Sequence, residues 1–212
     1  PDSRFARMEM ANLAMNRAVP DPELARRQYL YLIEQSRPST QLIGRLGLIA
    51  VDCFLNKKTA PEQISRAFEI EPEAVEADLI KAVQSLTNIV DANDCEGLSA
   101  IRLASELTKF ADRLAETKPH LPLWRFRFRA ARLYAASGDL EAGLEQAAQA
   151  WETRPTELPI GMFVAQLNVG LGHFEDARRI LEKIAPRIPE SDRTGQALLA
   201  ELRRTLDAET DS

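Results

Sequence analysis

The sequence predicts an all-α fold, in which about ten helices pack as a stack of antiparallel hairpins. The first observation behind this prediction is an internal repeat. Gly138 and Gly172 lie 34 residues apart, and so do Pro155 and Pro189. Two landmarks that share one offset indicate a repeated structural unit. The second observation is that apolar residues recur every three or four positions between proline-containing breaks, as on the buried face of a helix.

The repeated unit reads as a helix, a tight turn, a second helix and a proline, and in this it resembles the tetratricopeptide repeat. The first copy carries the resemblance at Arg127, Ala130, Ala131, Tyr134, Gly143, Ala147 and Pro155. The second copy carries it at Gly161, Val164, Ala165, Asn168, Ala177, Leu181 and Pro189. The first Trp of the family pattern is absent from both copies, and its Tyr from the second. The resemblance implies a right-handed superhelical solenoid that binds other proteins.

The chain is predicted to divide near Pro119 and Pro122, which form a stiff boundary. Residues 1–118 are expected to form a degenerate helical region of similar hairpins. Residues 119–212 are expected to hold two repeats, at about 124–157 and 158–191, and then a capping helix over 194–206. Such a helix turns a polar face to solvent at the end of the stack. Residues 207–212 are expected to be frayed.

Six helices are predicted before this boundary, from hydrophobic periodicity and from capping signals. Asp21 and Pro22 suit an N-cap and the first helical position. Thr59 and Glu62 form a capping box, and Ser99 is placed to cap the helix that follows it. The expected ranges are 5–19, 23–36, 41–55, a short helix ending near Ile70, one that opens at Glu71, Pro72 and Glu73 and reaches about Asn88, and 100–116.

The overall charge excludes some classes of function. The chain has 212 residues, a formal net charge of −5 and a pI near 5.3, which argues against general nucleic-acid binding because that requires a basic face. No apolar run approaches the ~18 residues of a membrane-spanning helix, and no signal peptide is visible. The chain opens at Pro1 without Met. We therefore expect any membrane association to come only from missing flanking segments of a parent chain.

The two cysteines, Cys53 and Cys95, leave two interpretations open. They are either separate thiols, one in a helix and one in a loop, or a disulfide that indicates an oxidising compartment. Neither has a partner at zinc-ligand spacing. The acidic stretch 61–96 is expected to be a solvated face. A metal-binding loop at 91–96 is the alternative, but this loop lacks the Gly and the distant Glu of a calcium hand. We expect no metal and no cofactor.

No catalytic constellation is visible, so the chain is not expected to be an enzyme. His120 and His173 both fall in predicted turns. The motifs of nucleotide-binding loops, serine hydrolases and zinc proteases are absent from the sequence.

The most distinctive candidate for recognition is the arginine- and aromatic-rich stretch 124–132. On a helix at 100° per residue, Arg125, Phe128, Arg129 and Arg132 share one face. In tetratricopeptide arrays the first helix of each hairpin lines a concave groove, so the resemblance implies a groove formed by Arg125, Phe128 and Arg132 with Met162 and Gln166. Arginine suits carboxylates, which indicates an acidic or C-terminal peptide as ligand. The alternative is that these arginines cover apolar surface and pair with nearby Glu residues.

The predicted function is therefore that of a non-enzymatic protein–protein interaction scaffold. The cysteines around a degenerate middle hairpin, followed by Gly138-Asp139 and Gly172-His173, are similar to the soluble C-terminal repeat regions of bacterial inner-membrane proteins in envelope glycan assembly. That resemblance implies a periplasmic or membrane-associated scaffold for polysaccharide assembly or secretion. The alternatives are a cytosolic adaptor or co-chaperone, and a helical regulatory domain that binds a small ligand.

Overall fold

The computed structural model describes residues 3–55, 61–92, 95 and 98–210, and this part of the chain is helical without any strand. The all-α prediction is confirmed, with eleven α-helices in the described residues where about ten were expected. The helices are α1 (Arg4–Asn16), α2 (Pro22–Ile33), α3 (Pro38–Phe54), α4 (Pro61–Phe68), α5 (Ala77–Ala92), α6 (Ala100–Thr117), α7 (Trp124–Ala136), α8 (Leu140–Thr153), α9 (Leu158–Gly170), α10 (Phe174–Ile184) and α11 (Arg193–Thr210), with a 3-10 turn at Ala185–Arg187.

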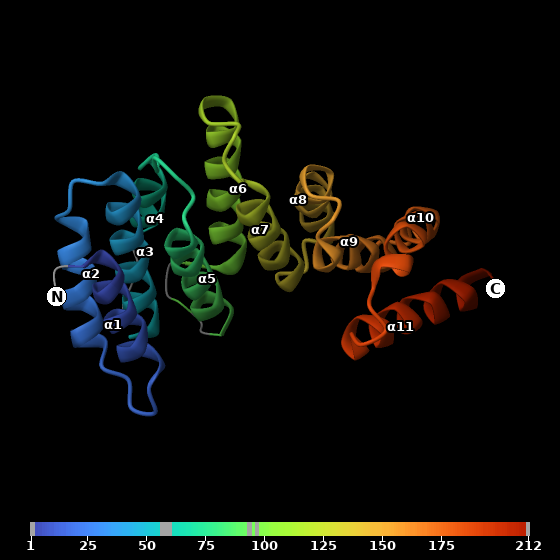
Figure 1. Cartoon of the computed structure of the whole chain (residues 1–212), viewed down its shortest axis with the longest axis horizontal. Helices are drawn as coiled ribbons and strands as arrows, with labels where there is room; N and C mark the ends of the chain where they lie inside the picture. Colours follow the sequence, from blue (N-terminus) through green and yellow to red (C-terminus); the bar gives the residue numbers. More distant parts are fainter. Residues whose placement is uncertain (1–2, 56–60, 93–94, 96–97, 211–212) are drawn as a thin grey trace.

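The helices form one elongated row, with the two ends of the chain at opposite ends of the molecule (Figure 1). Most consecutive helices pack against each other, from α1 on α2 to α9 on α10. Helices two apart also touch, α3 on α5, α5 on α7 and α9 on α11. In Figure 1 α6, α8 and α10 lie toward the top, while α5, α9 and α11 lie toward the bottom. This is the arrangement of a helical solenoid, as the repeat predicted.

The two turns at the predicted repeat positions have the same hydrogen bonds, one repeat apart. The amide of Asp139 donates to the carbonyl of Tyr134 at 3.0 Å, and that of His173 to Asn168 at 2.8 Å. Each turn passes through a glycine with positive φ, 85° at Gly138 and 76° at Gly172. A left-handed glycine followed by such a bond is the Schellman ending of a helix. The sequence repeat is therefore a repeat of backbone geometry.

Capping residues start the helices where the sequence indicated. The Asp21 carboxylate accepts from the amide of Leu24 at 2.9 Å, and the Ser99 hydroxyl accepts from Arg102 at 3.3 Å. Both satisfy amides that have no partner within the helix. The capping residue Thr59 lies outside the described residues. The C-terminal helix continues beyond its predicted end, because 207–210 are helical and not frayed.

The prediction that a helix opens at residues 71–73 is wrong, because α5 begins only at Ala77. The reason lies in contacts with residues that are distant in the sequence. The Glu73 carboxylate accepts hydrogen bonds from the amide and the hydroxyl of Ser39, at 3.0 and 2.9 Å, and from Arg37 at 2.8 Å. The Lys118 ammonium donates to the carbonyl of Pro72 at 2.8 Å. Contacts from the start of α3 and from the residue that follows α6 thus hold this segment in a non-helical path.

The same hydrogen bonds favour the ionised form of Glu73. Burial by itself raises the pKa of Glu73, but its own backbone amide, the amide and hydroxyl of Ser39 and the guanidinium of Arg37 lower the pKa to about 2. This carboxylate is therefore charged over the whole range in which the protein is expected to work.

The hydrophobic core crosses the boundary predicted at residue 118. Three rings from different helices form its centre, with Phe68 of α4 and Phe110 of α6 at a centroid distance of 4.9 Å, and Phe110 and Phe126 of α7 at 5.2 Å. One apolar cluster runs from Met8 to Leu133, and two more fill the hairpins after it. The N-terminal region and the repeats are thus joined through the packing of α6 on α7.

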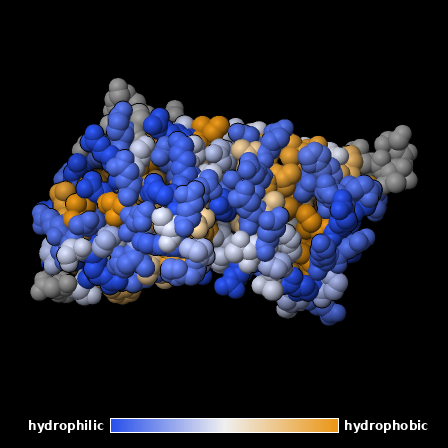
Figure 2. All heavy atoms as spheres, turned by 90° about the horizontal axis from the view of Figure 1, so that it is seen from above, coloured by the Kyte–Doolittle hydropathy of each residue, from blue (hydrophilic) through white to orange (hydrophobic). Residues whose placement is uncertain are grey.

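The face of the molecule shown in Figure 2 is largely hydrophilic. On the face shown in Figure 2 the apolar residues form separate patches between hydrophilic side chains. None of the helices described is both long enough and apolar enough to cross a bilayer.

Candidate functional site

The predicted recognition helix is α7, whose four arginines have different surroundings. Arg127 donates to Asp112 at 2.7 Å and to Gln146 at 3.0 Å, so it joins α7 to α6 and α8. Arg125 is exposed, and its guanidinium lies 5.0 Å from the centre of the Trp124 ring. Arg129 and Arg132 form no ion pair or hydrogen bond with the residues that the structure describes. Among the described residues, the proposed pairing with Glu residues is therefore not seen for Arg125, Arg129 or Arg132.

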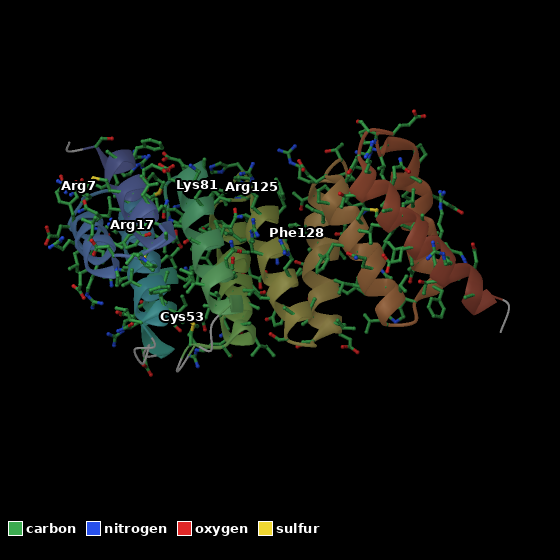
Figure 3. The ribbon with its side chains drawn as sticks, turned by 90° about the horizontal axis from the view of Figure 1, so that it is seen from below. Arg7, Arg17, Cys53, Lys81, Arg125 and Phe128 are labelled. Carbon is green, nitrogen blue, oxygen red and sulfur yellow. A yellow bond between two sulfur atoms is a disulfide. The ribbon has the colours of Figure 1, made fainter. Side chains whose placement is uncertain are left out.

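A groove of about 620 Å³ opens between α7, α9 and the start of α11. Most of its wall is apolar, and an edge-to-face pair of rings, Phe128 and Phe163, lies in it with centroids 5.7 Å apart. Figure 3 labels Phe128 on the side of α7 that faces the following hairpin. The groove is lined by Phe128, Arg132, Leu158, Pro159, Met162, Phe163, Gln166, Ile188, Asp192, Thr194, Gly195 and Leu198.

The structure brings four of the six predicted groove residues together. Phe128, Arg132, Met162 and Gln166 all line this groove. The other two lie outside it.

Arg129 instead lines a smaller hollow, the α5–α7 pocket, with Thr87, Asn88, Arg132, Leu133 and Ala136. Arg125 lies one turn before Phe128 and lines neither the groove nor this pocket. Arg132 is the residue that the groove and the pocket share.

The sequence prediction missed the part of the groove that comes from α11 and its preceding connection. Ile188, Asp192, Thr194, Gly195 and Leu198 lie there. Phe163 was missed as well, although its position next to Met162 on an almost wholly apolar helix was a usable signal. The connection could not be placed from periodicity, because it has none.

The groove has one available cationic group at its edge. Arg132 is exposed, while the only carboxylate in the lining, Asp192, accepts from the amide of Gly195 at 2.9 Å and so starts α11. Its charge is thereby turned toward the positive end of the helix. The arrangement offers an apolar groove that is also lined by an arginine without an ion-pair partner among the described residues.

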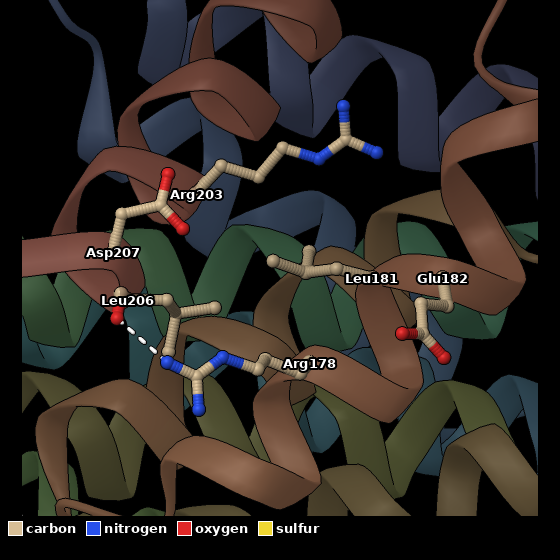
Figure 4. Close-up of a pocket in the computed structure, with 6 residues that line it drawn as sticks. All are labelled: Arg178, Leu181, Glu182, Arg203, Leu206 and Asp207. Carbon is tan, nitrogen blue, oxygen red and sulfur yellow. Dashed lines mark hydrogen bonds between the residues drawn. The ribbon is translucent and has the colours of Figure 1, made fainter. Parts of the chain in front are cut away.

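A third hollow, of about 290 Å³, lies between α10 and α11 (Figure 4). Arg178 donates there to the carbonyl of Leu206 at 2.7 Å and pairs with Glu175 at 2.7 Å. Glu182 and Asp207 line it together with Arg203, so positive and negative groups alternate around it. This balance of charges gives no preference for an anionic or a cationic ligand.

The two cysteines lie at the other end of the molecule. A disulfide joins Cys53, near the end of α3, to Cys95, which follows α5, with 4.9 Å between their Cα atoms. Figure 3 labels Cys53 at the lower end of its helix. In the described residues no three His, Cys, Asp or Glu side chains gather as metal ligands. Residues 93, 94 and 96 of the alternative metal loop at 91–96 lie outside the described residues.

Comparison with known proteins supports the tetratricopeptide superfamily. A family model described as tetratricopeptide repeat matches residues 134–202, from the end of α7 to the middle of α11. No curated protein matches the chain. Tetratricopeptide repeats generally bind other proteins or peptides and are typically non-catalytic, so the match suggests a protein–protein interaction scaffold.

Proposed function

We propose that this protein is a non-enzymatic scaffold that binds a short acidic and partly apolar segment of another protein in the groove between α7, α9 and α11. The observation that carries the proposal is the groove itself, with its apolar wall and the free Arg132 at its edge. Its volume of about 620 Å³ lies within the usual range of ligand sites, roughly 300–1,000 Å³.

The chemistry of the wall favours a peptide over a small polar ligand. Phe128, Phe163 and Met162 offer two rings and a thioether that can adapt to an apolar side chain. Gln166 offers an amide for the backbone of a bound chain. Because these side chains stand on helices and not on loops, this part of the groove is preformed, which lowers the entropy cost of binding.

The charge of the wall favours an acidic ligand. Arg132 has no carboxylate partner among the described residues, and a carboxylate of the ligand would pair with its planar fork. Arg125 lies two turns before Arg132 on α7 and is exposed, so it adds positive charge near the groove without lining it. An acidic residue that follows an apolar anchor would reach Arg132.

A peptide-display selection on the purified protein tests the proposal. Selected peptides are expected to combine a large apolar residue with Asp or Glu. Phe128→Ala removes an aromatic anchor and Arg132→Ala removes the charge, so each variant should bind these peptides at least tenfold more weakly. Binding is measured by isothermal titration calorimetry, with circular dichroism to verify that each variant is folded.

The matched control is Arg204→Ala, which removes an exposed arginine of α11 that does not line the groove. This variant should bind the selected peptides within twofold of the original protein. Equal affinity of all three variants, or selected peptides without acidic residues, would contradict the proposal.

The finer proposal is that the scaffold acts in the bacterial cell envelope, in polysaccharide or glycan assembly or in secretion, as the soluble domain of a larger protein. It is supported by the pairing of Cys53 with Cys95, since disulfides persist in oxidising compartments. Its partner would then be a protein of the assembly machinery, and its membrane attachment would come from a parent chain. If Cys53 and Cys95 were instead free thiols, the function of a cytosolic adaptor would be favoured.

A further inference from the structure

The α5–α7 pocket is lined by two cationic side chains. Arg129 and Arg132 lie one turn apart on α7 and both line the pocket. Arg127 of the same helix pairs with Asp112 at 2.7 Å. Arg129 and Arg132 have no such ion pair among the residues described. Two neighbouring guanidinium groups without a carboxylate repel each other, and an anion between them would remove the repulsion.

The surroundings of Arg129 agree with this. Its side chain is half-buried. Burial lowers the pKa of Arg129, and the charge of Arg132 lowers it further. Leu133 and Ala136 form an apolar wall, which reduces the screening of charges by water.

The remaining groups of the pocket are polar. Thr87 is buried and its hydroxyl donates to the carbonyl of Gln84 at 2.9 Å, so its hydrogen is not available to a ligand. Asn88 is exposed and its amide can donate to one. Two arginines and one asparagine therefore line a volume of about 80 Å³, more than the ~30 Å³ that a water molecule occupies.

We infer that the α5–α7 pocket is an anion site that takes a phosphate-type dianion between Arg129 and Arg132. A single carboxylate would satisfy one guanidinium fork and leave the other without a partner. A phosphate monoester carries about −1.5 to −2 charges at pH 7 and three acceptor oxygens, which matches two guanidinium groups and the amide of Asn88.

This site adjoins the peptide groove and shares Arg132 with it, but its other lining residues differ from those of the groove. The phosphate group can be free or can be carried by a phosphorylated side chain of a partner, and both sources have the same chemistry. The variants must therefore change one site at a time. Arg129 lines only the pocket, and Phe163 lines only the groove.

The test titrates inorganic phosphate into the full chain in a phosphate-free buffer and follows backbone amides and arginine Nε–H groups by NMR. A parallel titration uses N-acetyl-phosphoserine-N-methylamide, and sodium acetate is the monoanion comparison. We expect saturable shifts at α5 and α7 with one or both phosphate probes, and at least tenfold weaker binding of acetate. Tighter binding of the phosphoserine probe would assign the source to a modified partner, and binding of inorganic phosphate alone would assign it to the free ion.

Arg129→Gln should weaken phosphate binding at least tenfold but leave binding of the groove-selected peptides within twofold. Phe163→Ala should weaken binding of the peptides at least tenfold but leave phosphate binding within twofold. Arg204→Gln should change neither phosphate binding nor peptide binding. This pattern supports the inference, and it also separates failure of the pocket from failure of the groove. Shifts that do not saturate with either phosphate probe, or equal phosphate affinity in the original protein and in Arg129→Gln, would overturn it.

Discussion

At the scale of single residues, the repeat depends on two glycines that no other residue can replace without cost. Gly138 ends α7 with φ of 85°, a conformation that L-residues with a Cβ adopt only at a cost of ~1–2 kcal/mol. A Cβ at this position would meet no atom within 4 Å. The requirement for glycine therefore comes from the backbone and not from packing.

Gly138→Ala should accordingly lower the free energy of unfolding by about 1 kcal/mol, measured by urea denaturation. Gly138→Asn should cost less, because Asn tolerates the left-handed region. Replacement of Gly170 by Ala is the control. Gly170 is helical, and a Cβ there would lie at an ordinary contact distance of 3.4 Å from Leu140. Gly170→Ala should therefore stabilise the protein, and a loss of stability there would contradict this account.

At the scale of the elements, the two hairpins differ in how their second helices begin. The Asp139 carboxylate caps α8 by accepting from the amide of Ala142 at 3.1 Å. His173 occupies the same position of the next repeat, and no side-chain cap starts α10. The second hairpin thus lacks an interaction that the first one has.

Because Asn is a strong N-cap residue and adds no charge beside Glu175 and Asp176, His173→Asn should raise the free energy of unfolding by roughly 0.5–1 kcal/mol. The thermal midpoint measures this. Asp139→Ala is the matched reverse change and should lower the stability by about 1 kcal/mol. An unchanged or lower midpoint for His173→Asn would show that α10 is capped in another way.

Helices and turns of this protein could be predicted from the sequence because their causes are local. Gly138 and Gly172 set the turns, and Asp21 and Ser99 start helices, through bonds to residues three to five positions away. The path of residues 71–76 could not be predicted in this way. Its partners, Ser39 and Lys118, lie more than thirty residues from it in the sequence, and periodicity carries no information on such contacts.

The candidate site shows the same division between local and distant causes. Phe128, Arg132, Met162 and Gln166 could be placed in one groove, because helical spacing fixes their face and the repeat brings α7 and α9 together. The separation of Arg129 from the groove depends on where α5 packs against α7, and α5 lies in the region with the weakest repeat signal. The connection before α11 also lines the groove. Its path could not be predicted, because its sequence has no helical periodicity.

At the scale of the whole molecule, stability in a solenoid is local, because each unit contacts mainly its neighbours. The disulfide is the covalent exception. It joins α3 to the connection after α5 across a sequence separation of 42 residues, and it lies far from the groove in the row of helices. Loops of this length give a disulfide a typical stabilising effect of about 2–4 kcal/mol.

Reduction should therefore loosen the N-terminal half and leave the groove intact. Hydrogen exchange measured by mass spectrometry is expected to speed up in α3, α5 and α6 after reduction, with little change in α8–α10, and Cys53→Ser with Cys95→Ser should reproduce this without reductant. In protein taken from its native source and quenched in acid, both sulfurs should resist thiol labelling until they are reduced. Two thiols that label at once would place the protein in a reducing compartment and remove the support for the cell envelope. In the hydrogen-exchange experiment, faster exchange over all helices after reduction would show that the row of helices unfolds as one cooperative unit.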